Sequence, residues 1–192
     1  MSKFLTPRVS RVTAGLAVLS AFALAPVAAQ AATADATGTL SAGALSNTAP
    51  AITAFNASLT GLTQTVTTDV GALSVTDATG SNAGYSITVA ASAPTVGGAS
   101  AAAGTGGSLT LTKTTATAAA GNPAATGPQT TTGATQLLST TAATIANAAA
   151  TTGQGQWDFP AAPAGLSVVI PGNASAGAYS STLTFTTAPP VA

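Results

Sequence analysis

The sequence predicts an all-β protein built as an antiparallel β-sandwich, Ig-like or jelly-roll-like, and three observations carry this prediction. The chain is dominated by Ala, Thr, Gly, Ser and Val, and the β-branched Thr and Val suit the pleated surface of a strand. Several short segments alternate apolar and polar residues with the period of two that marks a half-buried strand. Clusters of Gly, Asn, Asp and Pro separate these segments, as the turns of an antiparallel sheet require.

The alternation is clearest in five segments. These strand predictions are residues 73–77, 84–90, 108–112, 166–170 and 178–186. In the second of them Tyr85, Ile87 and Val89 share one face, because successive side chains of a strand point to opposite sides. Residues 52–59 and 62–70 are weaker candidates. Alanine favours a helix between residues 137 and 150 while the flanking threonines favour a strand, and we expect a strand at 144–148.

The segments between the predicted strands contain turn and loop residues. Residues 77–84 and 171–177 hold the Asp, Asn and Gly that form short polar connections. The stretches at about 91–107 and about 114–135 are rich in Ala, Thr, Gly and Pro and have few large apolar side chains. Such segments bury too little surface to offset the entropy of ordering, so we expect long surface loops there.

The first 31 residues have the three parts of a secretory signal peptide. Lys3, Arg8 and Arg11 form a basic region, an apolar run follows over residues 12–29, and small residues at 29–31 fit a cleavage site. We therefore expect a secreted protein whose mature part, residues 32–192, forms one domain with a hydrophobic core. No second long apolar stretch follows, so no membrane-spanning helix is expected after cleavage.

The composition of the mature part excludes several classes of function. It has no His and no Cys, and therefore lacks ligands for zinc or copper, Ser-His or Cys-His nucleophiles, and disulfides. One basic side chain, Lys113, remains against four aspartates, which is too little positive charge to neutralise a run of nucleic-acid phosphates. We expect neither a cofactor nor a metal nor a nucleic-acid partner.

The aspartates are the remaining candidates for acid–base chemistry. A glycosidase needs two carboxylates, one on each side of the sugar bond. Asp69 and Asp77 are separated by roughly 25 Å if the chain between them is extended, which is too far for such a pair. Asp158 could approach either of them only through the fold. We expect these residues at turns and in solvent, with Asp77 ending its strand in an Asx turn.

Two large side chains occur once each in the mature part. Lys113 alternates with Leu109 and Leu111 and is expected at a strand end with its amine in water. The alternative is a crosslink between a buried lysine and an asparagine. Trp157 lies in residues 153–159 and could stack on a sugar ring, but a lone Trp in a sandwich is more often a core residue, which we expect here.

Five segments, taken in order, resemble the WxL family of secreted Gram-positive cell-wall-binding domains: residues 59–66, 73–89, 153–159, 166–171 and 176–185. The likeness covers roughly residues 37–188, and its most specific pieces are residues 75–85 and 177–185. The family is named for two Trp-x-Leu motifs. The matching positions in this chain read Tyr85-Ser-Ile87 and Phe185-Thr-Thr187.

The resemblance implies a β-sandwich that attaches noncovalently to peptidoglycan. It makes the large residues of the two motifs and the lone tryptophan the candidates for wall binding: Tyr85, Ile87, Trp157 and Phe185. An aromatic residue and its neighbour two positions on share one strand face, so the first motif can also build the core of the sandwich.

Together these observations predict a secreted, non-catalytic protein of the cell surface that associates with peptidoglycan or another cell-wall polymer. One alternative is a surface or fibre subunit that assembles with protein partners through the edges of its strands. A second alternative is a secreted wall hydrolase. The prediction contains no catalytic, cofactor-binding or metal-binding residue.

Overall fold

The computed structural model describes residues 37–96, 99–100, 107–122 and 126–190. The chain divides into two compact units, Met1–Thr39 and Leu40–Ala192. Of the first unit only residues 37–39 are described, and they are exposed and lack regular structure. The predicted signal peptide lies outside the described residues. The second unit, called the β unit below, contains every described strand.

The described part of the β unit contains strands and no helix, and all of its strand pairings are antiparallel. The first sheet has the order β1 (Leu45–Thr48), β3 (Leu73–Asp77), β12 (Gly155–Phe159) and β8 (Thr117–Ala118). The second has the order β10 (Thr135–Leu138), β7 (Ser108–Thr112), β13 (Ala162–Ile170) and β2 (Gln64–Val70). The third has the order β15 (Leu183–Ala188), β4 (Tyr85–Ala91), β11 (Ala143–Ala148) and β9 (Gln129–Thr130). A small fourth sheet has the order β14 (Tyr179–Ser180), β5 (Thr95–Val96) and β6 (Ala99–Ser100). Among these residues no helix could span a membrane.

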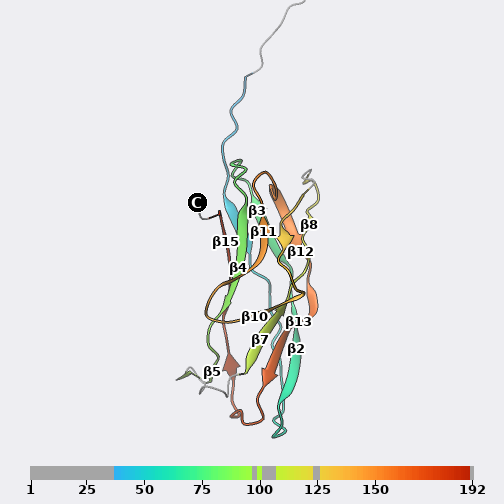
Figure 1. Cartoon of the computed structure of the whole chain (residues 1–192), viewed down its shortest axis with the longest axis vertical. Helices are drawn as coiled ribbons and strands as arrows, with labels where there is room; N and C mark the ends of the chain where they lie inside the picture. Colours follow the sequence, from blue (N-terminus) through green and yellow to red (C-terminus); the bar gives the residue numbers. More distant parts are fainter. Residues whose placement is uncertain (1–36, 97–98, 101–106, 123–125, 191–192) are drawn as a thin grey trace, which may run out of the picture. The chain divides into compact units, whose positions relative to one another are not determined.

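Two long antiparallel ribbons run through these sheets (Figure 1). In the first ribbon, β2 continues into β3, and β12 continues into β13 beside them. Strand β3 pairs with β12 and β2 pairs with β13, with Val70 of β2 opposite Ala162 of β13. In the second, β4 leads to β5 and pairs with β15 and then β14. Ser92 closes the junction of the second ribbon, because its amide donates to the carbonyl of Thr182 and its hydroxyl accepts from the Thr182 amide.

Side chains from the three larger sheets meet in one core. Val75 of β3 and Ile87 and Val89 of β4 are almost inaccessible to solvent, and each such side chain contributes roughly 1.5–3 kcal/mol of burial free energy. The edge strands β1 and β15 lie side by side, where Asn47 Nδ2 donates to the carbonyl of Phe185 at 3.1 Å. This arrangement confirms the predicted all-β sandwich.

Most of the predicted strands correspond to observed ones. The five strongest predictions match β3, β4, β7, the second half of β13, and β14 with β15, and the expected strand at 144–148 is most of β11. Of the weaker candidates, 62–70 contains β2. Residues 52–59 form no strand, and only Ile52 pairs, through an isolated bridge to Val70. That segment has the polar residues Asn56 and Ser58 on the face of Ile52, where a strand would need further apolar side chains.

The two expected loops contain short strands as well. The first, at about 91–107, includes β5 and β6, and the second, at about 114–135, includes β8 and β9. Each of these strands has two residues, and β8 and β9 extend the edges of larger sheets. Their threonines suit strand geometry, so short pieces pair where an edge is available although the segments supply little to the core.

Candidate functional site

The two motif segments, about a hundred residues apart in the sequence, form neighbouring strands. Tyr85-Ser-Ile87 begins β4, and Phe185-Thr-Thr187 lies in β15. In the antiparallel register Ile87 lies opposite Thr187, and Phe185 lies opposite Val89. The structure therefore brings both motifs to one edge of the third sheet. Periodicity alone could not predict this pairing, because it does not say which strands are neighbours.

Three of the four wall-binding candidates are buried. Tyr85 is 2 % exposed, Ile87 is 0 % exposed and Trp157 is 5 % exposed, whereas Phe185 is half-buried and packs against the core. The expected core position of Trp157 is confirmed. A polymer outside the folded domain has almost no access to the three buried side chains, so their contacts are with the rest of the sandwich.

Tyr85 and Trp157 hold the same turn at one end of the β unit. The Tyr85 hydroxyl donates to the carbonyl of Gly153 at 3.2 Å, and Trp157 Nε1 donates to the carbonyl of Gln154 at 3.0 Å. Burial, followed by the nearby carboxylate of Asp77, raises the pKa of Tyr85 from 10.0 to about 12. The phenol is therefore neutral and remains a hydrogen-bond donor at ordinary pH.

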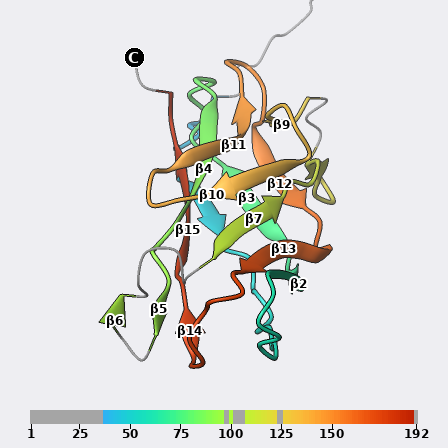
Figure 2. The same ribbon diagram turned by 60° about the horizontal axis from the view of Figure 1, so that its bottom comes forward.

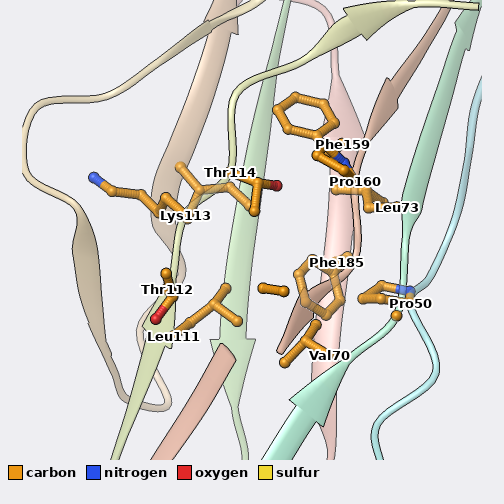
Figure 3. A pocket seen from close by; sticks show the side chains of 13 residues that line it. Pro50, Val70, Leu73, Leu111, Thr112, Lys113, Thr114, Phe159, Pro160 and Phe185 are labelled. Atoms are coloured by element: carbon orange, nitrogen blue, oxygen red, sulfur yellow. The ribbon is translucent and has the colours of Figure 1, made fainter. Parts of the chain in front are cut away.

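Phe185 borders a small cavity, which Figure 3 shows from close by. The cavity has a volume of about 40 Å³ and is lined mainly by apolar side chains such as Phe159. Its size is close to the ~30 Å³ that one water molecule occupies in the liquid, and far below the roughly 300 Å³ of the smallest ordinary ligand pockets. It cannot receive a segment of a wall polymer.

The amine of Lys113 points away from the rings of Phe159 and Phe185 (Figure 3). It donates to three protein oxygens, the carbonyl and hydroxyl of Thr131 and the carbonyl of Thr132, at 2.8–3.0 Å. Lys113 follows the end of β7, as expected. The expectation that its amine is hydrated by water alone is wrong, because the amine donates to these three protein oxygens. The carbonyls before β10 lie within reach of the amine and replace part of its hydration.

The three described aspartates each have a structural partner. Asp77 accepts bonds from the amide and the hydroxyl of the residue two positions on, which confirms the predicted Asx turn. Asp69 accepts from the amide of Ala164, whose φ of 53° lies at the bulge of β13. Asp158 accepts from the hydroxyl of Ser74 at 2.7 Å. The carboxylate of Asp77 thus stabilises a turn, that of Asp69 a β-bulge, and that of Asp158 a cross-strand contact.

A much larger groove, of about 680 Å³, lies at the other end of the β unit. Four pieces of chain line it: residues 54–59, Pro94 between β4 and β5, residues 175–181, and the end of β13 with its neighbour β7. Figure 2 shows β14 at this end, with β9 and β11 at the opposite end. Pockets that bind small organic molecules occupy roughly 300–1,000 Å³, so the groove has the volume of a ligand site.

The groove has an apolar floor and two aromatic side chains. Leu109 and Val168 lie opposite each other on β7 and β13, and Ile170 continues the same face of β13. This is the face that forms the core further along the strand, so the floor is an open extension of the core. Phe55 and Tyr179, both half-buried, come from the two connecting segments.

The remaining groove residues, apart from Leu59 and Pro94, are small or polar. The polar ones are Asn56, Ser58, Ser175, Ser180 and Ser181. Hydrogen bonds fix this wall, because the Tyr179 hydroxyl donates to the carbonyl of Ser175 at 2.7 Å and the Ser181 hydroxyl donates to the carbonyl of Ser92 at 2.8 Å. Among the described residues that line the groove, none carries a formal charge.

Sequence reasoning missed this groove. Residues 171–177 were predicted as a turn and residues 52–59 as a weak strand, and neither prediction brings the two segments together. One signal was available, because Phe55, Leu59 and Leu62 are large apolar residues close to each other without a clear alternating pattern. Leu59 and Leu62 are indeed exposed, at 45 % and 73 %. Several exposed large apolar side chains that lie next to each other form the kind of patch that marks a binding surface, whereas single ones need no explanation.

Comparison with known families gives one match. The family model described as WxL, a WxL domain for surface cell wall binding, matches residues 33–189. The match includes both motif strands, the turn held by Tyr85 and Trp157, and the whole groove. No curated protein and no solved structure matches the chain significantly.

Proposed function

The chain belongs to the WxL family of surface cell wall-binding domains, and from this membership we propose that it is a secreted protein that attaches noncovalently to peptidoglycan. The family match over residues 33–189 carries the proposal, because it spans nearly all of the β unit rather than one motif. Secretion follows from the signal peptide predicted at residues 1–31.

The groove supports a binding role rather than a catalytic one. It offers a ligand-sized volume, an apolar floor and a polar wall, which is the usual composition of a binding pocket. The whole sequence has no His and no Cys, and the three described aspartates are engaged in structural hydrogen bonds outside the groove. A hydrolase would need two carboxylates facing one bond, so the non-catalytic role is the better proposal.

The four residues first considered for wall binding take an indirect role in this proposal. Tyr85, Ile87 and Trp157 are buried within the sandwich, and Tyr85 and Trp157 also hold one turn in place. Phe185 fills the side of the core next to the small cavity. Their replacement is expected to weaken wall binding by unfolding the domain. Replacement of groove residues is expected to weaken wall binding while the domain stays folded.

The test is cosedimentation of the purified chain with peptidoglycan sacculi. Sacculi stripped of other wall polymers are compared with untreated walls, and a tube without sacculi controls for aggregation. We expect the chain to pellet with stripped sacculi. A chain that pellets only with untreated walls binds another wall polymer, and a chain that stays in the supernatant in both cases contradicts wall binding.

A second candidate function, assembly with protein partners, has one observation in its favour. Strand β2 ends its sheet, and residues 64–68 of this edge carry neither a charge nor a proline that would discourage pairing with another strand. Size-exclusion chromatography with light scattering tests it. Thr65→Lys with Thr67→Lys, both at exposed positions, is expected to convert an assembled form to monomer; a native chain that is monomeric at high concentration contradicts this function.

A further inference from the structure

We propose that the groove binds the glycan strand of peptidoglycan, and not its stem peptides. This inference rests on the proposed function and adds the place and the chemical class of the ligand. The groove is the set of residues 54–59 and 175–181 over the floor formed by Leu109, Val168 and Ile170. Charge, ring surfaces, hydrogen-bonding groups and rigidity each favour a glycan.

Charge separates the components of a cell wall from one another. Stem peptides carry carboxylates and amines, and many other wall polymers carry phosphates, whereas the acetylated amino sugars of the glycan strand are neutral wherever the lactyl carboxyl group is in an amide bond. A site for an ionic ligand needs opposite charges, since a buried unpaired charge is costly. Among the described residues that line the groove there is no charged side chain, and the amine of Lys113 is held by Thr131 and Thr132 elsewhere. The groove is therefore matched to a neutral ligand.

The aromatic side chains provide surfaces that suit sugar rings. One face of a pyranose ring consists mainly of C–H groups, which pack on the flat side of an aromatic ring. Phe55 and Tyr179 line the groove from different segments, and both are half-buried, so that part of each side chain is accessible to a ligand. Two such rings over an apolar floor can contact more than one sugar of a strand.

The wall of the groove supplies the polar contacts that amino sugars require. Sugar hydroxyls and acetamido groups both donate and accept hydrogen bonds, as do the carboxamide of Asn56 and the hydroxyls of Ser58 and Ser175. The Tyr179 hydroxyl donates its proton to the carbonyl of Ser175, so its oxygen remains able to accept a bond from a sugar.

Hydrogen bonds within the protein hold the segments that line the groove in place. Tyr179 is tied to Ser175, Ser180 Oγ lies 2.9 Å from Thr95 Oγ1, and Gln64 Nε2 donates to the carbonyl of Ser58 at 2.8 Å. These bonds tie residues 54–59 to β2 and residues 175–181 to β5. Because the segments are already ordered, less conformational entropy is lost when a ligand binds.

The experiment uses the intact chain and two probes from the same sacculi. An amidase separates the glycan strands from the stem peptides and leaves a free lactyl carboxylate on each muramic acid. This carboxylate is converted to its amide so that the glycan probe is neutral, and each fraction is then titrated into the chain by calorimetry. We expect binding to the glycan fraction and none to the peptide fraction. Tyr179→Ala is expected to lower glycan affinity by about tenfold, the size of one lost aromatic contact. Tyr179→Phe, which keeps the ring, should retain most of the affinity.

Two further variants separate the groove from the rest of the molecule. Ala176→Trp places a large side chain in the groove at an exposed position and removes no packed group, so it should abolish glycan binding while circular dichroism stays native. Leu137→Ala changes an exposed leucine on β10 that does not line the groove, and should bind like the native chain.

The outcomes distinguish this inference from the proposed function. If the chain pellets with sacculi but binds stem peptides instead of glycan, or if folded Tyr179→Ala and Ala176→Trp variants bind glycan like the native chain, the inference is overturned and wall binding stands. If the chain does not pellet with sacculi at all, the proposed function fails. Glycan binding that only the groove variants lose supports both.

Discussion

The β unit has a pair of aromatic side chains at each end, and the two pairs differ in what they contact. Tyr85 and Trp157 are buried and donate hydrogen bonds to the backbone of one turn, whereas Phe55 and Tyr179 are half-buried and line a groove. Trp157 lies on β12, and Tyr179 begins β14, which pairs with β5. Figure 1 shows β12 and β5 towards opposite ends of the β unit.

The difference follows from where each pair lies in the chain. Tyr85 and Trp157 sit within strands, on the faces that alternate into the core, and the sandwich covers them. Phe55 lies in a connection, and Tyr179 begins the short strand β14, beyond the large sheets. An aromatic residue in a long strand thus stabilises this fold, and one in a connecting segment remains available to a ligand. Four substitutions and one control test that division.

The largest effect is expected from Trp157→Ala. Truncation of a large buried aromatic residue typically costs about 3–5 kcal/mol of unfolding free energy, and this one also removes the hydrogen bond to Gln154. Urea unfolding followed by circular dichroism measures the loss. A variant that loses less than about 1 kcal/mol would contradict the assignment of Trp157 to the core.

Gly127→Ala tests the same packing by adding a methyl group to the residue that contacts the Trp157 ring. A Cβ atom at Gly127 would lie 2.3 Å from Cζ3 of Trp157, so the ring must move or the backbone must shift. Overpacking of this kind costs about 1–3 kcal/mol. Unfolding and the tryptophan emission spectrum are both expected to change.

The matched control for this substitution is Gly38→Ala. It makes the same chemical change where no atom lies within 4 Å of the added methyl group. We expect unfolding and fluorescence to equal those of the native chain. Equal behaviour of the two variants would mean that Gly127 is not tightly packed against Trp157.

Tyr85→Phe removes one hydroxyl from the buried pair and leaves the ring. The carbonyl of Gly153 loses its donor, and the expected cost is about 1 kcal/mol of unfolding free energy. Equilibrium unfolding at neutral pH measures it. An unchanged stability would show that the hydrogen bond at 3.2 Å contributes nothing.

The same variant has a signature at high pH. The pKa of Tyr85 is about 12 in the folded state, against 10.0 for an ordinary tyrosine, so the folded state holds the phenol proton more tightly. Its contribution to stability is complete below about pH 10 and is lost as the pH rises from there towards 12. We expect the native chain to lose more stability over this interval than Tyr85→Phe does.

The buried pair shows how far periodicity alone can predict this molecule. The alternation of Tyr85, Ile87 and Val89 predicted a strand with one buried face, and those three side chains are among the most buried in the described structure. The turn at Asp77 was predicted from local chemistry and is present. Both predictions rest on interactions between residues close in sequence, which a sequence displays directly.

The groove shows where such prediction ends. Phe55 and Tyr179 line one groove only because β13 and the β4–β5 ribbon bring residues 54–59 and 175–181 to the same end of the β unit. Strand order and register decide this, and neither can be predicted from alternation. The pairing of the two motif strands through Ile87 and Thr187 was beyond sequence reasoning for the same reason.

The smallest effect on folding, and the sharpest test of the comparison, is expected from Tyr179→Ala. The ring is half-buried and its hydroxyl bonds a carbonyl four residues away in the same segment, so we expect a loss below about 1 kcal/mol in urea unfolding. Trp157→Ala should lose several times more. Binding should follow the opposite order when measured on folded protein: Tyr179→Ala is expected to weaken retention on peptidoglycan while its unfolding curve stays nearly native. If Tyr179→Ala instead unfolds as readily as Trp157→Ala, the groove end is part of the structural core, and the division between a stabilising pair and a ligand-facing pair does not hold.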